Sequence, residues 1–575
     1  MSKVSRADEI KDFLIGAGWG TAKITPLAGD ASFRRYDRIS RGKQVAVLMD
    51  APPDFEDTRP FVALAKYLRS IGLGAPKVYA SDYDRGLLLL EDLGDDLLKR
   101  VLDREPSKEK ILYQKAVDEL VKINTLLPTK ELPFGEGSHC LQVYDMEMLL
   151  SEALLIIDWY YPANTDKRLT FSKREEFIRI CCKILTAVSG VSDCLTLRDY
   201  HAENLLECEN GRIGVIDFQD AVIGNSAYDL VSLLQDARRD VSPHIELEML
   251  EYFCNKTDKD IAKFKEHYAI LGAQRNMKII GIFARLYLRD GKNHYIKFIP
   301  RVWRLLERCL EHPALSELRT WLDKEIPNRR SEVFVPNPLK PSQAVVLAAG
   351  LGKRMAPLTD NIPKPLIEIN GKMMLAQTLD NLADSAVTNT IVNKHHFAKQ
   401  IDQFVIDRKD WRPKITLSDE TDGLLDSGGA IKKVLPLMGK DPFYILNSDM
   451  IWKDKDQGAL SRLATEWRDD MDVLLLLIKR SEAHGHEGAG DFHMDKDGRL
   501  TFRGEDTHSD YFYGGIHIVR PTCFEGIEEN KFSLRKVFRQ TAAKGRLFGL
   551  LHNGSWYHVG TPVSVYETEK LLKGK

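Results

Sequence analysis

The stretch Ala344–Gly371 reads AVVLAAGLGKRMAPLTDNIPKPLIEING and is the most distinctive part of this 575-residue sequence. Its apolar start predicts a buried β-strand. The strand is followed by four small residues, Ala348, Ala349, Gly350 and Gly352. Small residues let a ligand approach the backbone of a strand end and let the next loop wrap phosphates. Arg354 and Lys364 add positive charge, and prolines on both sides restrict the Lys364 backbone, so the stretch predicts a nucleotide-phosphate site.

The sequence around this stretch predicts two domains. Downstream, apolar runs such as FYILNSD and DVLLLLIK alternate with helical patterns such as MLAQTLDNLA, which is typical of an α/β domain with a parallel sheet, here over residues 343–575. Upstream, residues 326–342 hold four prolines and little periodicity, so we interpret them as a linker. Helical periodicity dominates residues 1–325 after about Asp103.

A second motif lies in the first domain, at Leu197–Asp220, which reads LRDYHAENLLECENGRIGVIDFQD. Asp199 and Asn204 are five residues apart, and Asp217 follows an apolar strand pattern. This spacing suits phosphoryl transfer. Asp199 can accept the proton of an attacking hydroxyl, while Asn204 and Asp217 offer oxygen ligands to the magnesium ion that bridges nucleotide phosphates.

This motif resembles that of the aminoglycoside phosphotransferase and choline kinase superfamily, H-x-D-x-x-x-x-N followed by a strand ending in I-D, although Leu197 replaces the histidine. The resemblance implies a multidomain protein whose first domain is a two-lobed, protein-kinase-like α+β fold. Its N-terminal lobe would span about 1–92 and its helical lobe about 93–325. ATP would be the phosphate donor.

The resemblance also implies contacts with ATP upstream of the motif. The segment LAGDASFRRYDRI would form a loop over the phosphates that carries Ser32 and Arg34. The segment GLLLLEDLGDDLL would join the two lobes, and backbone groups near Glu91 and Leu93 would meet adenine.

One expected feature of kinases is missing. A phosphate-binding lysine usually lies on the third strand and pairs with a glutamate in the next helix. The aligned strand has Leu48, Met49 and Asp50, and the helix RPFVALAKYLRS has no glutamate. Either Arg34 or Arg35 neutralises the phosphates instead, or the domain binds nucleotide without transferring phosphate. Retention of the three motif residues favours an active enzyme.

These departures, together with LRDYHAENLL and VIDFQDAVIGNSAYDLVSLLQDAR, resemble the anomeric kinases of N-acetylmuramate and N-acetylglucosamine. The resemblance implies phosphorylation of the 1-hydroxyl of an amino sugar. It also implies a buried structural role for Asp229.

The stretch Ala344–Gly371 resembles the signature of sugar-phosphate nucleotidyltransferases, L-A-A-G-x-G-x-R-M-x-P-L-T followed by P-K-P-L. The resemblance implies a Rossmann-like, GT-A-like domain in which a sugar-1-phosphate oxygen attacks the α-phosphate of a nucleoside triphosphate. Arg354 would hold the leaving phosphates and Lys364 the attacking phosphate. Asp449, which ends the predicted strand FYILNSD, would bind magnesium.

The same resemblance implies roles for residues further along the chain. Two loop residues would contact the base and ribose, Asp426 and Gly428. Three would contact the sugar, Gly490, Asp491 and Gly515. His558 stands where the family usually has a second metal-binding aspartate, so the sequence allows one magnesium ion or two.

The second domain looks most like N-acetylmuramate-1-phosphate uridylyltransferases, which would make the product of the first domain the substrate of the second. The predicted function is salvage of a cell-wall sugar, first with ATP and then with UTP, to give a UDP-sugar and pyrophosphate with Mg²⁺ in both steps. Two alternatives stay open. One is a choline kinase fused to a phosphocholine cytidylyltransferase, for which Trp159–Tyr161 offers an aromatic cage. The other is a pseudokinase that regulates the nucleotidyltransferase.

Composition limits the expected partners. The 82 Lys and Arg residues against 84 Asp and Glu give a net charge of −2, so no overall field attracts nucleic acid or an anionic membrane. We see no secretory signal and no apolar run long enough to span a bilayer, which predicts a cytoplasmic protein. Eight cysteines without a C-x-x-C pair predict neither a disulfide framework nor a zinc site. The expected partners are small-molecule amino sugars and nucleotides, and no obligate protein partner is evident.

Overall fold

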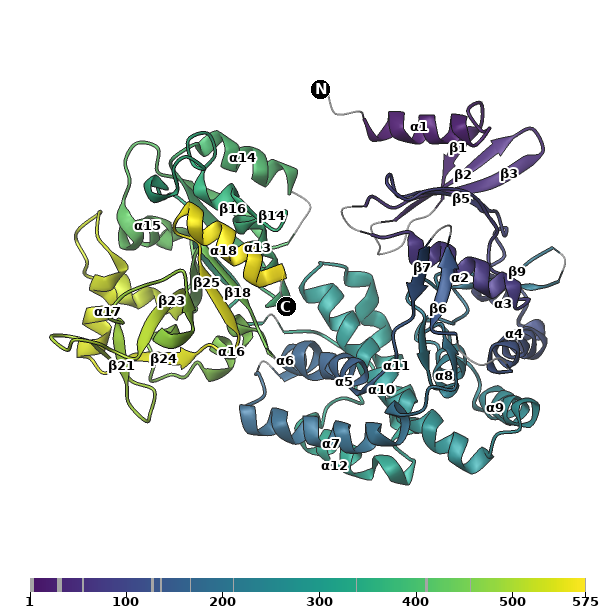
Figure 1. Cartoon of the computed structure of the whole chain (residues 1–575). Coiled ribbons are helices and arrows are strands. Elements are labelled where there is room, and N and C mark those ends of the chain that lie inside the picture. Colours follow the sequence, from purple (N-terminus) through teal and green to yellow (C-terminus); the bar gives the residue numbers. More distant parts are fainter. Residues whose placement is uncertain are drawn as a thin grey trace. The chain divides into compact units, whose positions relative to one another are not determined.

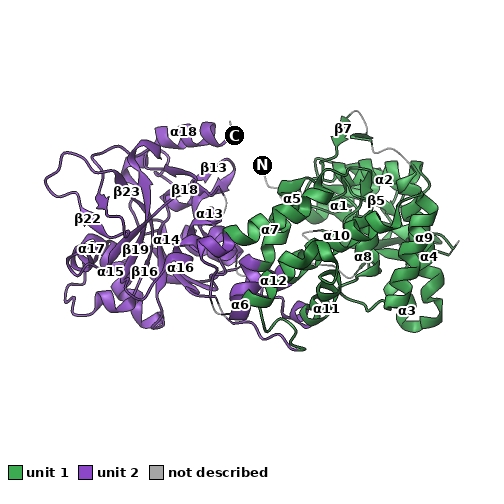
Figure 2. Cartoon of the chain, turned by 90° about the horizontal axis from the view of Figure 1, so that it is seen from below, with its two compact units in different colours: residues 1–156, 175–280, 298–332 green, residues 157–174, 281–297, 333–575 purple. Residues whose placement is uncertain are grey.

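The computed structural model describes residues 5–27, 34–53, 56–125, 129–134, 137–165, 167–209, 211–337, 339–408, 412–455 and 457–573. The chain forms two compact units, which Figure 2 shows in different colours. The first unit comprises residues 1–156, 175–280 and 298–332. The second comprises residues 157–174, 281–297 and 333–575.

The first unit begins with an antiparallel sheet of order β1-β2-β3-β5-β4. Its strands are β1 (Lys23–Pro26), β2 (Arg35–Arg41), β3 (Gln44–Asp50), β4 (Val78–Asp82) and β5 (Leu87–Glu91). Helix α1 (Arg6–Gly16) lies beside this sheet in Figure 1 and packs Phe13 and Leu14 into a core with Ile39 and Leu48. The α2 helix (Arg59–Ser70) follows β3.

The rest of the first unit is mainly helical. Its helices are α3 (Leu98–Arg104), α4 (Glu109–Asn124), α5 (Met146–Leu155), α7 (Phe171–Ser189), α8 (Ala227–Leu234), α9 (Pro243–Thr257), α10 (Ile261–Leu288), α11 (Ile299–Cys309) and α12 (Ser316–Glu325), of which α7 and α10 extend into the second unit. Short strands form the pairs β6 (Glu131–Phe134) with β7 (Gly137–Cys140), β8 (Cys194–Thr196) with β11 (Val222–Gly224), and β9 (Leu205–Glu207) with β10 (Ile213–Val215). The predicted helical lobe after a β-rich lobe is therefore present.

The second unit is built on a mixed sheet of order β16-β15-β12-β17-β23-β19-β24. Its strands are β12 (Gln343–Leu347), β15 (Asn389–Lys394), β16 (Lys414–Asp419), β17 (Phe443–Asn447), β19 (Val473–Lys479), β23 (Tyr511–Val519) and β24 (Leu547–Leu551). The strands β16, β15, β12 and β17 are parallel, as predicted. Strand β23 is antiparallel to both neighbours, which departs from the predicted parallel sheet. An antiparallel strand added to a parallel sheet is common in such folds.

Helices cover both faces of this sheet. Along β12, Ala344 and Val346 belong to one apolar core and Val345 to the other, so successive side chains point to opposite faces. The first core includes side chains of α13 (Met374–Asp384), α14 (Ala398–Asp407) and α16 (Ala459–Glu466). The second includes side chains of α15 (Asp426–Val434) and α17 (Leu534–Ala543). Burial on both faces explains why the central strands are apolar runs without alternation.

A smaller sheet of order β18-β25-β20 completes the second unit. Its strands are β18 (Met450–Lys453), β20 (Ala483–His484) and β25 (Ser555–His558), and the last helix is α18 (Pro562–Lys573). Among the described residues, no helix combines the length and apolar content that crossing a bilayer requires.

Candidate active sites

The structure brings the three motif residues of the first unit together. Asp199 and Asn204 lie on the loop between β8 and β9, and Asp217 follows β10, which pairs with β9. The Asn204 side-chain nitrogen donates to the Asp199 carbonyl oxygen at 2.9 Å and lies 3.4 Å from Asp217 Oδ2. Because the amide nitrogen makes these contacts, the Asn204 amide oxygen and the Asp217 carboxylate are the atoms that suit a divalent cation.

Two residues of this site have a left-handed backbone conformation, with φ of 71° at Arg198 and 59° at Asp217. Such conformations cost about 1–3 kcal/mol each for residues other than glycine. Asp229 on α8 stabilises the left-handed conformation at Arg198, because its carboxylate accepts the N–H groups of Leu197 (2.6 Å) and Arg198 (2.8 Å). Burial raises the pKa of Asp229 to about 7. This side chain holds the Asp199 loop from inside the lobe.

The environment of Asp199 keeps its carboxylate ionised. Burial alone would raise the pKa of Asp199, but nearby positive side chains, with Lys278 first among them, hold it below its usual value. At Asp217 burial has the larger effect and, together with the charge of Asp199, raises the pKa. An ionised carboxylate beside the predicted cation ligands can accept a proton from an attacking hydroxyl.

An arginine ion pair lies where the kinase lysine and glutamate are missing. Leu48, one of the three β3 residues predicted to replace the kinase lysine segment, is fully buried in the core against α1. Arg34 Nε instead donates to both carboxylate oxygens of Glu56, at 2.7 and 2.8 Å, and Arg34 Nη1 lies 3.4 Å from Asp217 Oδ1. The Arg34 side chain is only 8% exposed, whereas that of Arg35 is 60% exposed. Of the two predicted candidates, Arg34 is the one beside the motif.

The second unit has a cavity of about 450 Å³ at the carboxyl ends of β12 and β17. These strands are parallel neighbours, so the loops after them meet at one edge of the sheet, where ligands bind in such folds. Eight residues predicted from the sequence line the cavity: Ala348, Ala349, Gly350, Gly352, Arg354, Lys364, Asp426 and Asp449.

Asp449 is the most strongly paired carboxylate of this cavity. Lys364 Nζ lies 2.5 Å and His558 Nε2 lies 3.6 Å from Asp449 Oδ2. Burial alone would raise the pKa of Asp449, but hydrogen bonding with His558 and the charge of Lys364 hold it well below its usual range. His486 Nδ1 in turn lies 3.3 Å from His558 Nδ1. Asp449 is thus an ionised carboxylate held between a lysine and a histidine.

Known proteins similar to this chain also match it in two separate parts. Residues 23–267 match the phosphotransferase enzyme family, and residues 343–574 match the nucleotidyl transferase family. An N-acetylmuramate/N-acetylglucosamine kinase of Caulobacter vibrioides is 37% identical over 347 residues, covering 55% of this chain and 95% of that protein. An N-acetylmuramate alpha-1-phosphate uridylyltransferase of the same organism is 36% identical over 235 residues, covering 40% of this chain and 97% of that protein. The chain belongs to both families.

A kinase of the first family from Pseudomonas aeruginosa is also similar, with 34% identity over 320 residues that cover 54% of this chain and 91% of that protein. The predicted order of a phosphotransferase fold followed by a nucleotidyltransferase fold is confirmed. The chain is a bifunctional enzyme with a kinase half and a nucleotidyltransferase half.

Of the other residues predicted to bind nucleotide in the kinase half, Glu91 and Leu93 lie in the part of the chain that the structure describes. Ser32 lies outside the described residues. Glu91 uses its side chain to bind Arg69 (2.9 Å) and Arg212 (2.6 Å) and its backbone N–H to bind the Lys77 carbonyl oxygen (2.8 Å). Leu93 follows directly in the segment after β5.

The aromatic run that suggested a choline site is buried. Trp159, Tyr160 and Tyr161 are 8%, 2% and 7% exposed. A cage for a quaternary ammonium ion needs open aromatic faces around the ligand. The comparisons with amino-sugar enzymes likewise disfavour the choline alternative.

Five predicted residues of the nucleotidyltransferase half do not line the cavity: Gly428, Gly490, Asp491, Gly515 and His558. Gly428 is packed against Phe532, whose carbonyl oxygen accepts its N–H at 2.8 Å. A Cβ added at Gly515 (φ 79°) would lie 3.3 Å from the side-chain nitrogen of Asn447, a residue that lines the cavity. Gly490 (φ 85°) precedes Asp491, whose carboxylate accepts the Tyr513 N–H at 3.1 Å.

Sequence reasoning missed Asn393 and Glu420, which also line the cavity. Asn393 Oδ1 accepts the N–H groups of Ala348 (2.6 Å) and Ala349 (3.2 Å), and Asn393 Nδ2 donates to Glu420 Oε1 (2.7 Å). The backbone N–H groups of both alanines are therefore already hydrogen-bonded to Asn393 while the two residues shape the phosphate loop. A polar residue near the end of the apolar strand TIVNK was the available signal.

The candidate magnesium ligands of each half are few. Among the described residues, no three His, Cys, Asp or Glu side chains gather as a metal-binding group. Asn204 and Asp217 fit magnesium by ligand chemistry, and so does Asp449. His558 offers a ring nitrogen, which magnesium disfavours, and that ring already faces Asp449 and His486.

Proposed function

We propose that this chain salvages a peptidoglycan sugar in two consecutive steps. The kinase half would phosphorylate the anomeric hydroxyl of N-acetylmuramate or N-acetylglucosamine with ATP. The uridylyltransferase half would join N-acetylmuramate 1-phosphate to UMP from UTP and release pyrophosphate. The observation that carries the proposal is the convergence of Asp199, Asn204 and Asp217 in a chain whose two halves resemble enzymes with consecutive substrates.

In the kinase step Asp199 takes the proton of the sugar 1-hydroxyl. The sugar oxygen then forms a bond to the γ-phosphorus of ATP, the bond from that phosphorus to the bridging oxygen breaks, and ADP leaves. Asn204 and Asp217 would hold a magnesium ion, which when bound neutralises phosphate charge. Arg34, kept in place by Glu56, would bind the phosphates from the β-rich lobe.

In the transferase step a sugar-1-phosphate oxygen attacks the α-phosphorus of UTP, and pyrophosphate leaves with the electrons of the broken bond. Lys364 would hold the attacking phosphate and Arg354 the leaving phosphates, because charge increases on the oxygens around the α-phosphorus. Asp449 would bind magnesium. The His558 ring, whose Nε2 lies 3.6 Å from Asp449 Oδ2, would support Asp449 from beside it rather than act as a second metal ligand.

The test is product analysis with the full-length chain, N-acetylmuramate, ATP, UTP and magnesium. Wild type should give the UDP-sugar, Lys364→Ala should accumulate sugar 1-phosphate, and Asp199→Asn should give neither product. Feeding sugar 1-phosphate to Asp199→Asn should restore UDP-sugar formation. ATP turnover that does not depend on an amino sugar, or no turnover at all by wild type, would contradict the proposed function.

A further inference from the structure

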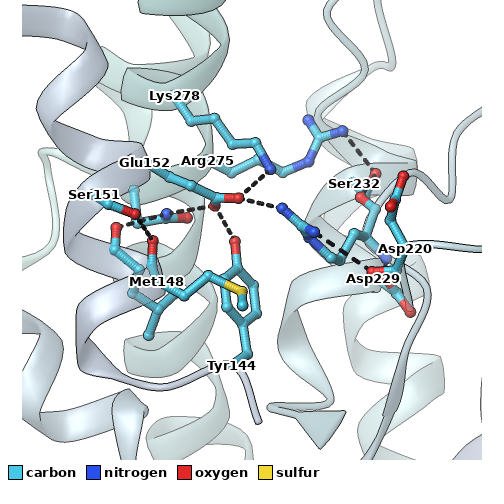
Figure 3. Close-up of polar contacts among 12 residues, drawn as sticks. Tyr144, Met148, Ser151, Glu152, Asp220, Asp229, Ser232, Arg275 and Lys278 are labelled. Atoms are coloured by element: carbon cyan, nitrogen blue, oxygen red, sulfur yellow. Dashed lines mark hydrogen bonds and ion pairs between the residues drawn. The ribbon is translucent and has the colours of Figure 1, made fainter. Parts of the chain in front are cut away.

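Arg198, which directly precedes the proposed base Asp199, is held both at its backbone and at its side chain. Its N–H donates to Asp229 Oδ1 at 2.8 Å, and its carbonyl oxygen accepts the Ser232 hydroxyl at 3.2 Å. Its guanidinium donates through Nη2 to the carboxylate of Glu152 on α5. Figure 3 shows Glu152 on one side of this cluster and Asp229 and Ser232 on the other. Helix α8 therefore holds the backbone of Arg198, and helix α5 holds its side chain.

The ion pair between Arg198 and Glu152 is largely buried. The two side chains are 19% and 12% exposed, and the Arg198 guanidinium carbon lies 5.4 Å from the centre of the Tyr144 ring. Glu152 also accepts from Lys278 Nζ at 2.7 Å and from Gln274 Nε2 at 3.1 Å (Figure 3). If the guanidinium of Arg198 were removed, Glu152 would still have a cation as its partner.

Stability alone does not explain such a pair. Both ions lose their hydration on burial, and replacement of a buried ion pair by apolar side chains often leaves a protein equally stable or more stable. This pair, however, lies on the residue next to the catalytic base. The position of a base relative to the reacting hydroxyl strongly affects the rate of reaction. The pair is therefore better explained by the orientation that it gives to Asp199.

The backbone conformation of Arg198 shows how the pair acts on its neighbour. The φ of Arg198 is 71°, a left-handed value that a residue other than glycine keeps only where surrounding contacts fix it. Rotation of this backbone toward the ordinary region would change the direction of Asp199. Glu152 opposes that rotation because it holds the end of the Arg198 side chain. Arg198 Nη1 also lies 3.5 Å from the carbonyl oxygen of Asp220, three residues after Asp217.

We propose that Glu152 is a positioning residue that acts through Arg198, and that their ion pair holds the Asp199 carboxylate in the orientation in which it accepts the proton of the sugar hydroxyl. Neither Glu152 nor Arg198 would touch the sugar or the nucleotide. The inference rests on the proposed kinase activity, and it adds α5 to the elements that build the kinase site.

The test measures kcat and KM separately in the full-length chain. ADP release without UTP is followed for wild type and Arg198→Met, with N-acetylmuramate and N-acetylglucosamine as separate acceptors. We expect kcat to fall about ten- to a hundredfold, because a small displacement of the base has an effect of this size, whereas the KM values for ATP and sugar should stay within about threefold. Thermal unfolding should change little, because Glu152 keeps Lys278 as a partner.

Arg239→Met is the matched control, because Arg239 makes a similar ion pair away from the Asp199 loop. Its Nη1 lies 2.6 Å from Glu109 Oε1, its side chain is 14% exposed, and its guanidinium carbon lies 5.7 Å from the centre of the Tyr113 ring. We expect Arg239→Met to leave kcat unchanged and to shift thermal unfolding at least as much as Arg198→Met does.

A second set of variants tests whether Glu152 acts through Arg198. Glu152→Gln should lower kcat in the wild-type background and have almost no further effect in the Arg198→Met background, because its partner is already lost. Arg198→Lys keeps one charged donor for Glu152 and should retain most of the wild-type kcat. The lysine variant also keeps the inference testable if Arg198→Met does not fold.

Several results would overturn the inference. A rise in KM as large as the fall in kcat would mean that Arg198 binds a substrate. An unchanged kcat in Arg198→Met, an equal fall in Arg239→Met, or an equal effect of Glu152→Gln in both backgrounds would exclude the positioning role. Each of these results leaves the kinase activity of wild type standing. Turnover of neither sugar by wild type would instead overturn the proposed function, and the inference with it.

Discussion

Replacement of Arg34 tests how the kinase half binds phosphates without the usual lysine. The Arg34 guanidinium makes two contacts with Glu56, at 2.7 and 2.8 Å, in a site where the two side chains are 8% and 25% exposed. Partly buried hydrogen bonds between charged groups are worth about 1.5–3 kcal/mol. At about 1.4 kcal/mol per factor of ten, Arg34→Gln should lower kcat/KM for ATP about ten- to a hundredfold. Glu56→Gln keeps one acceptor oxygen and should cost about fivefold.

The assay is ADP release with N-acetylmuramate and no UTP, so that only the kinase site is measured. In an Arg34→Gln background, Glu56→Gln should have almost no further effect, because the positioning residue has lost its partner. Arg35→Gln is the control, since Arg35 lies on β2, is 60% exposed and pairs with Asp37. Equal effects of Arg34→Gln and Arg35→Gln, or a full effect of Glu56→Gln without Arg34, would refute the reasoning.

Three further predictions concern stability and packing. Asp229→Asn leaves one of two backbone N–H groups without an acceptor, so it should cost about 1–3 kcal/mol and lower kinase kcat, measured by thermal unfolding and ADP release. Gly428→Ala places a Cβ 2.3 Å from the Phe532 ring, so it should abolish uridylyl transfer but leave kinase activity unchanged. Gly423→Ala is the control, because its Cβ meets nothing within 4 Å and both activities should stay unchanged. Burial lowers the pKa of His517 to about 3. Below about pH 6.5 the unfolded chain therefore binds a proton at His517 and the folded chain does not, so the free energy of unfolding falls as the pH drops. Denaturant unfolding should show a loss of about 2 kcal/mol between pH 6.5 and pH 5 that His517→Gln removes and a change at exposed His244 does not.

Short-range spacing explains which parts of the sites could be predicted from sequence. Asp199, Asn204 and Asp217 lie within one loop and one hairpin, so their distances along the chain nearly fix their distances in space. The same holds for Ala348 to Arg354 at the end of one strand. Asp449 follows β17, and β17 is the parallel neighbour of β12, so Asp449 lies beside the loop that follows β12.

Partners that come from distant segments could not be predicted. Glu56 lies between Asp54 and Asp57 in the sequence before α2, and nothing there signals which of these acids contacts Arg34. Asn393 and Glu420 meet Ala348 only because β15 lies between β12 and β16, an order that local sequence does not encode. The apolar run of β23 likewise carries no sign of strand direction, since both parallel and antiparallel interior strands are apolar.

The two active sites share one electrostatic arrangement although their folds are unrelated. In the kinase half, Asp217 faces Arg34 at 3.4 Å, and in the transferase half Asp449 faces Lys364 at 2.5 Å. In each pair the carboxylate is the proposed metal ligand and the cation is the proposed phosphate ligand. A magnesium nucleotide brings positive charge on the metal and negative charge on the phosphates, so on binding the carboxylate would pair with the metal and the cation with the phosphates. The desolvation cost of each pair is therefore met during folding, which leaves more of the binding energy for orienting the reacting phosphate.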